Sequence, residues 1–199
     1  SARTRFLEFD NREEDMKKGI DFLAVVLTCA ILSGIAHGED YVCYGYAGSM
    51  MVDNLIVPQG VACTLYGTFV KGSIKVEKNA ALSASRIYVI GNIQAENAAQ
   101  VDVLSGSDVG GNIQIKQGGG AVIDGVRIKG DLQFEKNRSG LTVNRNTIGG
   151  NLQAFKNSGG LSITQNAIDA NLQCKENWPA PTGGGNIVRG NREDQCANF

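Results

Sequence analysis

A short repeated motif constrains the fold of this chain more than any other feature. Each copy starts with a polar residue, here named the anchor, which is followed by Ile or Leu and then usually by Gln, and copies recur every 19 or 20 residues. The clear anchors are Ser73, Asn92, Asn112, Asp131, Asn151 and Asn171, with degenerate copies at Asn54 and Asn191. So regular a period is typical of a solenoid, in which each unit buries its apolar face by stacking on its neighbours.

Three short apolar clusters occur in each repeat. The first follows the anchor, as Ile74 and Val76 do, and the second begins ten residues before the next anchor, as in Leu141 and Val143. The third is a single aliphatic residue three positions before the anchor, such as Ile148. Alternation at i and i+2 is strand periodicity, and no window supports a helix. The pattern predicts an all-β fold, a three-sided parallel β-helix of about seven coils, and parallel crossovers make it right-handed.

Glycine and asparagine are expected at the corners between these strands. Glycine precedes most anchors, at Gly72, Gly91, Gly111, Gly130, Gly150 and Gly190. Asparagine recurs six residues after several anchors, at Asn79, Asn137, Asn157 and Asn177. Both residue types tolerate positive φ better than others, so we expect sharp turns with left-handed backbone at these positions.

The chain before residue 39 has the character of an export signal. Met16, Lys17 and Lys18 form a positively charged start, residues 22–35 are an apolar run too short to span a bilayer comfortably, and Ala36 and Gly38 are small residues suited to signal-peptidase cleavage after Gly38. The sequence therefore predicts an upstream segment at 1–15, a signal peptide at 16–38 and one domain at 39–199. An uncleaved anchor is the alternative interpretation of the apolar run.

Four cysteines remain after that signal, and they fall into two pairs. Cys43 and Cys63 are 20 residues apart, and Cys174 and Cys196 are 22 apart, which is one coil in each case. Equivalent positions on neighbouring coils lie about 5 Å apart, within disulfide range. We predict both disulfides, formed in an oxidising compartment and pinning the two ends of the solenoid. A zinc site is the rival interpretation, but the chain has no Cys-x-x-Cys spacing.

Several function classes are disfavoured by what the sequence lacks. The only histidine, His37, lies in the predicted signal peptide, so the remaining domain has no Ser-His-Asp triad and no histidine-ligated metal. The net charge is −1, and charges balance from Glu39 onward, which gives no electrostatic surface for nucleic acid or an anionic membrane. We assign no catalytic residue, cofactor or metal, and expect no membrane span in the processed chain.

With histidine-based mechanisms disfavoured, carboxylate chemistry is the enzymatic route that stays open. It has to be considered because parallel β-helices include pectin lyases and polygalacturonases. Arg127, Ile128 and Lys129 match a short polygalacturonase motif, yet Ile128 occupies the inward position before an anchor, and the paired Asp-Asp and Gly-His-Gly signatures are missing. Other acidic candidates are Asp102, Asp108, Asp124 and Asp131. They occupy different phases of the repeat, so we expect solvated surface rather than one acid/base or calcium cluster.

The most regular outward feature is a row of amides two residues past successive anchors. It comprises Gln94, Gln114, Gln133, Gln153 and Gln173, with Lys75 and Glu193 in the same phase at its ends. Amides in register can bond along the stack, which is a structural role, or they can form a polar strip that binds a polysaccharide or a second copy. Tyr66, Phe155 and Trp178 offer sugar-stacking rings but share no phase of the repeat.

The repeated Gly-Asn-Leu-Gln units and the C-terminal run from Asn171 to Cys196 resemble a class of exported bacterial proteins of uncharacterised activity. This resemblance implies a β-helix and export. A looser likeness in coil geometry is to bactofilins, which polymerise end to end, but these are usually cytosolic and lack end disulfides. We therefore expect an exported, non-enzymatic structural, adhesive or surface-binding protein in the periplasm, at the cell surface or secreted. A polysaccharide lyase or hydrolase is the alternative.

Overall fold

The computed structural model describes residues 40–199, which form three parallel sheets and contain no helix. Sheet A comprises β1 (Tyr41–Val42), β4 (Leu55–Val57), β7 (Ile74–Val76), β10 (Ile93–Glu96), β13 (Ile113–Lys116), β16 (Leu132–Glu135), β19 (Leu152–Phe155), β22 (Leu172–Lys175) and β25 (Arg192–Asp194). Sheet B comprises β2 (Gly45–Ala47), β5 (Ala62–Tyr66), β8 (Ala81–Ser85), β11 (Gln100–Leu104), β14 (Gly120–Asp124), β17 (Leu141–Asn144), β20 (Leu161–Thr164) and β23 (Thr182–Gly184). Sheet C comprises β3 (Met51–Val52), β6 (Phe69–Val70), β9 (Tyr88–Val89), β12 (Asp108–Val109), β15 (Arg127–Ile128), β18 (Thr147–Ile148), β21 (Ala167–Ile168) and β24 (Ile187–Val188). The predicted upstream segment (1–15) and signal peptide (16–38) lie outside the described residues.

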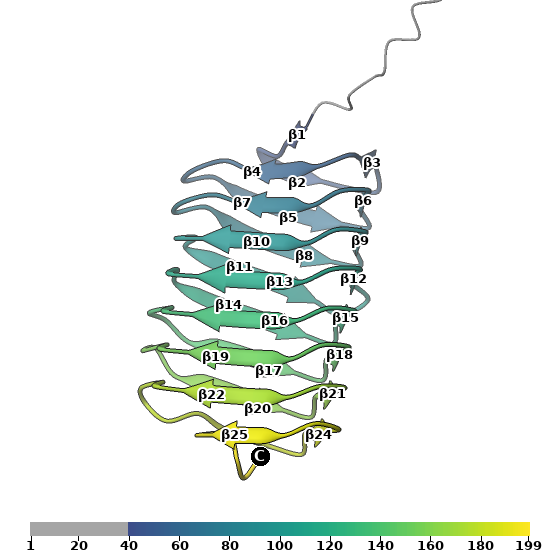
Figure 1. Ribbon diagram of the computed structural model, residues 1–199. Coiled ribbons are helices and arrows are strands. Elements are labelled where there is room, and N and C mark those ends of the chain that lie inside the picture. Colours follow the sequence, from purple (N-terminus) through teal and green to yellow (C-terminus); the bar gives the residue numbers. More distant parts are fainter. Residues whose placement is uncertain (1–39) are drawn as a thin grey trace, which may run out of the picture. The chain divides into compact units, whose positions relative to one another are not determined.

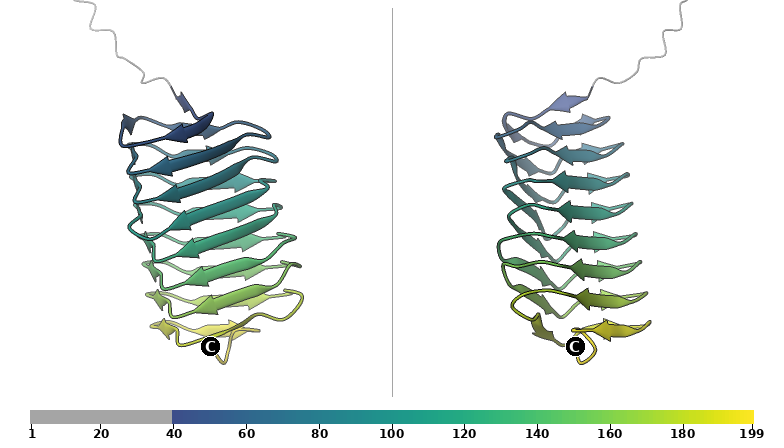
Figure 2. Two further views of the ribbon diagram at one scale, coloured as in Figure 1. Left: turned by 180° about the vertical axis from the view of Figure 1, so that it is seen from behind. Right: turned by 60° about the vertical axis from the view of Figure 1, so that its left-hand side comes forward.

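The chain passes through sheets A, B and C in turn and stacks its coils as a right-handed parallel β-helix. In Figure 1 the strands of sheet A run leftward at the front and those of sheet B run rightward behind, while the chain descends from its N-terminal coil to its C-terminal coil. Figure 2 shows the same stack from two other sides, with one strand of each sheet in every coil. The predicted fold class is confirmed.

The predicted number of coils, about seven, is too low by one. Eight coils each contribute a strand to all three sheets, and β25 adds a ninth strand to sheet A. The missed coil is the first, residues 40–53. It is shorter than the repeat, since Tyr41 pairs with Leu55 whereas Leu55 pairs with Ile74, and it does not start with the usual Gly and anchor.

The core fills the space between the three sheets, as the alternating pattern predicts. Ile74 and Val76 in sheet A, Leu141 and Val143 in sheet B and Ile148 in sheet C are all buried, and the same phases are buried in neighbouring coils. Each buried aliphatic side chain contributes about 1.5–3 kcal/mol. Each coil thus contributes one layer of inward side chains to a continuous core.

Both predicted disulfides are present and connect adjacent coils. Cys43 and Cys63 have Cα atoms 5.9 Å apart, and the Cα atoms of Cys174 and Cys196 are 5.4 Å apart. The four residues are buried at the first and last coils of the stack. These bonds fit an oxidising environment.

The glycines that precede the anchors have a different role from the one predicted. None of the six has a positive φ. Their missing side chain instead gives room to the neighbouring coil: a Cβ on Gly111 would lie 2.8 Å from the Gly91 carbonyl oxygen and would overlap the Asn92 side chain. That side chain accepts a hydrogen bond from the Asn112 backbone N–H at 2.8 Å. Glycine is therefore required for close approach of the coils.

The prediction for the asparagines is right for Asn79, whose φ is +58°, and wrong for Asn137, Asn157 and Asn177. In those three coils the preceding residue takes the left-handed backbone, and the asparagine points into the interior. The Asn137 backbone N–H and side-chain amide both donate to Asn157 Oδ1 at 3.0 Å, and Asn157 donates likewise to Asn177. Buried amides are tolerated here because each one is hydrogen-bonded.

A second interior ladder was not anticipated from the sequence. Asn146, Asn166 and Asn186 repeat the same bonding at another corner, where Asn146 donates to Asn166 Oδ1 from its backbone and its side chain. Asn166 in turn donates to Asn186 Oδ1 at 3.0 Å. The side-chain amides also donate to main-chain carbonyls, such as Val143 O for Asn166.

Within 40–199 no helix could span a membrane.

Candidate binding face

The predicted amide row lies in register on the outer face of sheet A. Pairing of β10, β13, β16, β19 and β22 places each glutamine directly beside the next, from Gln94 to Gln173. Strand pairing extends the row to Lys75 at one end and Glu193 at the other. The five glutamines therefore lie side by side along the sheet, in five successive coils.

Hydrogen bonds run along this row in segments. Gln114 Nε2 donates to Gln133 Oε1 at 3.1 Å, and Gln153 Nε2 donates to Gln173 Oε1 at 2.7 Å. Gln173 Nε2 then donates to Glu193 Oε2 at 2.7 Å. These bonds hold the amides in fixed orientations, which is the structural role expected of stacked side chains. Because an amide has two donors and an acceptor with two lone pairs, the bonds along the row leave capacity that faces solvent.

A second outward column follows two residues after the amides. Its members are Glu77, Glu96, Lys116, Glu135, Phe155 and Lys175. It carries charges of both signs, with Lys116 Nζ 3.9 Å from Glu135 Oε2. Phe155 is half-buried between Glu135 and Lys175. The signal for this column was present in the sequence as a charged residue two positions after most of the glutamines, but it was not singled out.

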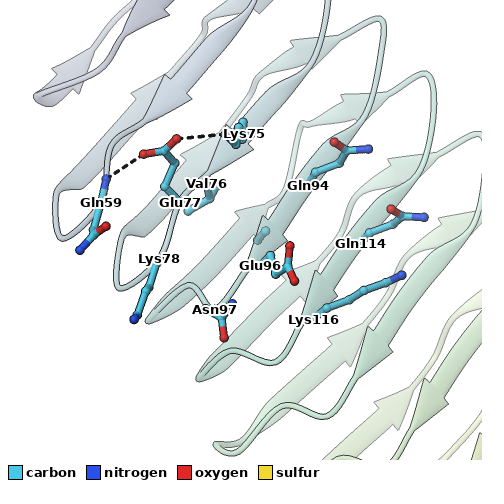
Figure 3. A pocket seen from close by; sticks show the side chains of 11 residues that line it. Gln59, Lys75, Val76, Glu77, Lys78, Gln94, Glu96, Asn97, Gln114 and Lys116 are labelled. Carbon is cyan, nitrogen blue, oxygen red and sulfur yellow. Dashed lines mark hydrogen bonds and ion pairs between the residues drawn. The ribbon is translucent and has the colours of Figure 1, made fainter.

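A shallow hollow of about 660 Å³ lies over the N-terminal part of this face. Figure 3 shows Lys75, Gln94 and Gln114 along one side of it and Glu77, Glu96 and Lys116 along the other. The Lys75 ammonium in β7 pairs at 3.0 Å with the carboxylate of Glu77, the residue that directly follows this strand. The hollow is thus lined by hydrogen-bonding groups of both charges and by neutral amides.

Two acidic groups on this face, Glu77 and Glu135, have pKa values lowered by neighbouring lysines. A hydrogen bond from Lys75, with its charge, lowers the pKa of Glu77 below its ordinary value. A hydrogen bond from Lys136, again with its charge, lowers the pKa of Glu135. A glycosidase with paired carboxyls needs one of them to stay protonated near neutral pH, which requires a raised pKa. Neither Glu77 nor Glu135 has the raised pKa that such an acid needs.

The other acidic candidates are separated, as the sequence predicted. Asp102 and Asp124 lie on sheet B, Asp108 on sheet C and Asp131 at the start of a strand of sheet A. Their hydrogen-bonding or ionic partners are Gln100 and Val122 for Asp102, Arg145 and Asn144 for Asp124, Arg127 for Asp108, and Gln133 and Asn151 for Asp131. In the part of the chain that the structure describes, no three His, Cys, Asp or Glu residues are grouped as metal ligands would be.

The remaining sequence candidates do not form a second site. Ile128 is buried, and its neighbours Arg127 and Lys129 are exposed, so the motif shared with polygalacturonases is an ordinary strand end. Tyr66 lies on sheet B, and Trp178 lies in the loop between β22 and β23. These two rings and Phe155 are on different parts of the surface.

Comparison with known proteins adds no assignment: no family model, curated protein or solved structure matches this chain. The binding face therefore has to be judged on its own chemistry.

Proposed function

We propose that this protein is an exported, non-enzymatic β-solenoid of the bacterial envelope that binds polysaccharide along the outer face of sheet A. The observation that carries the proposal is the amide row, which presents one hydrogen-bonding side chain per coil in register from Gln94 to Gln173. Coils repeat about every 4.8 Å, so the row is a periodic polar surface. A periodic hydroxyl-bearing polymer can match such a row at several coils at once.

The composition of the face favours a neutral or zwitterionic glycan. Amides donate and accept hydrogen bonds without charge, and the hollow beside them is lined by both lysines and glutamates. Phe155, farther along the same face, adds an apolar surface on which a sugar ring can pack. A strongly acidic polymer would meet Glu77, Glu96 and Glu135, which repel it.

Export is part of the proposal and depends on two separate observations. The sequence before residue 39 has the features of a signal peptide. The two disulfides at the ends of the stack fit an oxidising compartment such as the periplasm or the extracellular space. The resemblance of the repeats to exported bacterial proteins supports the same location.

Co-sedimentation with insoluble glycans tests the binding role. The oxidised protein is mixed with purified peptidoglycan, cellulose and chitin, and the bound fraction is measured for the unaltered chain and for the triple variant Gln114→Thr, Gln133→Thr, Gln153→Thr. Threonine favours strands, so the fold is kept while the amides are removed. The matched control changes three outward hydroxyls of sheet B, Thr64→Ala, Thr142→Ala and Thr182→Ala.

We expect binding of at least one glycan that is lost in the glutamine variant and kept in the control, with similar thermal unfolding of all three proteins. Equal loss in both variants would show that the amides only stabilise the fold. Failure of the unaltered protein to bind any glycan would contradict the proposal. Release of soluble sugar that one Glu→Gln change abolishes would identify an enzyme instead. Light scattering on the same samples separates this role from self-association into filaments.

A further inference from the structure

The exposed apolar side chains of the described fold lie near its two ends. In the first three coils they are Val42, Tyr44, Tyr46, Met50, Met51, Tyr66, Tyr88 and Ile90, and in the last coil they are Trp178 and Ile187. Between residues 91 and 177 of the described chain, no large hydrophobic side chain is exposed. The N-terminal group is the larger one, and it extends beyond the first coil, so an open chain end does not explain it.

The first two coils carry apolar groups on all three of their outer sides. Six outward apolar residues, two on each sheet, are here named the collar: Val42 and Ile56 on sheet A, Tyr46 and Tyr66 on sheet B, and Met51 and Phe69 on sheet C. Tyr46 and Met51 are the most exposed, at 62% and 63%. From the third coil onward most outward positions of sheets A and B are polar, as at Lys75 and Ser83, with single apolar exceptions such as Phe155. Figure 2 shows these coils in dark blue at one end of the stack.

The same two coils are almost free of charge. In residues 40–72 the only charged residues are Asp40, Asp53 and Lys71; the Asp53 carboxylate lies 3.1 Å from Lys71 Nζ, and Asp40 Oδ1 accepts a hydrogen bond from the Asn54 side chain at 3.0 Å. Charged side chains recur throughout the rest of the described chain. Removing this end from water therefore requires the desolvation of fewer charged groups than for any other two adjacent coils of the stack.

From this distribution we propose that the collar is a membrane-contact surface, with which the N-terminal end of the β-helix inserts into the interfacial layer of a lipid bilayer. A partner protein packed against one side would cover one sheet and leave the other two apolar sides in water. A second copy stacked end to end would cover the strand edges of the first coil and leave the rings of Tyr66 and Phe69 exposed. A bilayer surface surrounds the end on every side.

The dimensions and residue types of the collar fit this interface. Two coils are about 10 Å deep, and interfacial elements bury their apolar side by roughly 5–10 Å. Tyrosine, which supplies two of the six residues, is favoured at membrane surfaces because its ring is apolar and its hydroxyl stays hydrated. In sequence the collar also follows closely on the apolar run 22–35. Contact through apolar groups with no basic cluster should be insensitive to salt and to lipid charge.

Fluorescence quenching with the whole chain tests the proposal, since Trp178 is its only tryptophan and marks the opposite end. A tryptophan is introduced in the collar by Met51→Trp in a Trp178→Phe background, and the unaltered chain serves as the matched probe. Both are mixed with phosphatidylcholine vesicles whose acyl chains carry bromine. We expect the Met51→Trp protein to shift its emission to the blue and to be strongly quenched, while Trp178 in the unaltered chain is not.

Two further changes make the test specific to the collar. Adding Tyr46→Ser and Tyr66→Ser to the Met51→Trp protein should abolish most of the quenching, whereas adding Ile187→Ser should leave it intact. Because quenching reports where the collar lies, attachment of the chain through residues 22–35 alone leaves Met51→Trp unquenched and overturns the proposal. A blue shift that appears without lipid, together with a dimer in sedimentation velocity, would assign the collar to a second copy and overturn it equally.

Discussion

The two halves of the β-helix close the same interior corners with different chemistry. At one corner the N-terminal coils place Ala80, Ala98 and Gly118 where the C-terminal coils place Asn137, Asn157 and Asn177. At another corner the position changes along the chain from Ile87 through Ser107 and Val126 to Asn146, Asn166 and Asn186. The fold is therefore compatible at these corners with small or aliphatic residues as well as with hydrogen-bonded asparagines.

The difference matters because a substitution should destabilise the two kinds of corner to different extents. An apolar corner loses only its own contacts when a side chain is shortened. An asparagine in a ladder bonds the backbone N–H of the previous coil, the amide of that coil and a main-chain carbonyl, so its loss removes a hydrogen bond from three buried polar groups at once. We expect the C-terminal half to be the more sensitive to single substitutions.

The largest effect should come from Asn166→Leu, in the middle of a ladder. Leucine removes three buried hydrogen bonds: the only acceptor of the Asn146 N–H, one of the two acceptors of the Asn146 amide, which keeps the Ile123 carbonyl, and the side-chain donor to the Val143 carbonyl. Lost buried bonds of this kind cost about 1–3 kcal/mol each, so we expect a loss of roughly 3–6 kcal/mol. Ile87→Val at the same corner of the N-terminal half should cost only about 1 kcal/mol. Equilibrium unfolding in urea measures both, and equal losses would contradict the proposed difference between the halves.

Removing the disulfides should sharpen the same comparison. Each bond closes a loop of one coil, so Cys43→Ala with Cys63→Ala, or Cys174→Ala with Cys196→Ala, should cost about 3 kcal/mol. The C-terminal coil keeps other ties, since Asn177 N–H donates to Gln195 Oε1 at 2.8 Å and Gln195 Nε2 donates back to the Asn177 carbonyl.

Hydrogen exchange followed by mass spectrometry reports the consequence for each end. Amide protection should disappear from the first coil in the N-terminal disulfide variant, and should be reduced but present in the last coil of the C-terminal variant. Equal loss of protection at both ends would show that the Asn177–Gln195 bonds add nothing to the disulfide.

The sequence predicted what depends on the period alone. A repeat of 19 or 20 residues fixes which positions point inward, so the buried phases, the three sheets, the register of Gln94 to Gln173 and both disulfides followed from counting. The first coil was missed because it departs from that period. The collar was missed for a related reason: its outward residues become visible as one surface only when three sheets are placed around a common axis.

Roles that depend on the neighbouring coil were assigned wrongly or not at all. Gly111 and Asn157 were interpreted as residues for positive φ, which is a property of one backbone position. Their actual roles are to admit the Asn92 side chain and to bond Asn137, and both depend on what lies one coil away. The hollow on sheet A was not predicted either, because its shape depends on how the Lys75 and Glu77 side chains pair.

A smaller effect is expected from alanine at two glycines, one in each half. At Gly91 a Cβ would lie 2.5 Å from the Gly72 carbonyl oxygen, a backbone atom that cannot move freely, so Gly91→Ala should cost about 1–3 kcal/mol. At Gly140 the nearest heavy atom to a new Cβ is the Gly159 oxygen at 3.9 Å, so Gly140→Ala should be tolerated. Urea midpoints for the two variants decide this, and an unaffected Gly91→Ala protein would show that the coils can separate at that corner.

The smallest effect concerns acid stability, for which Glu77 in the N-terminal half and Glu135 in the C-terminal half are an informative pair. Hydrogen bonds from Lys75 and Lys136, with their charges, lower the pKa of both carboxyls in the folded protein. In acid the unfolded chain therefore binds protons at these groups more readily than the folded chain. The stabilisation is present at neutral pH and is lost as the pH falls through the lowered pKa values.

Replacing both carboxylates by Glu77→Gln and Glu135→Gln should therefore reduce the loss in urea midpoint between pH 7 and pH 3 relative to the unaltered protein. Both pairs are exposed to solvent, so the change should be the smallest of the four, and 1 M NaCl should remove most of it by screening. The single variants separate the halves. Because each pair lies on the surface at the end of a sheet A strand and makes no bond to the interior ladders, Glu77→Gln and Glu135→Gln should have similar effects. A much larger effect of Glu135→Gln would mean that the amide ladders transmit surface changes into the core, and that the halves differ in rigidity as well as in chemistry.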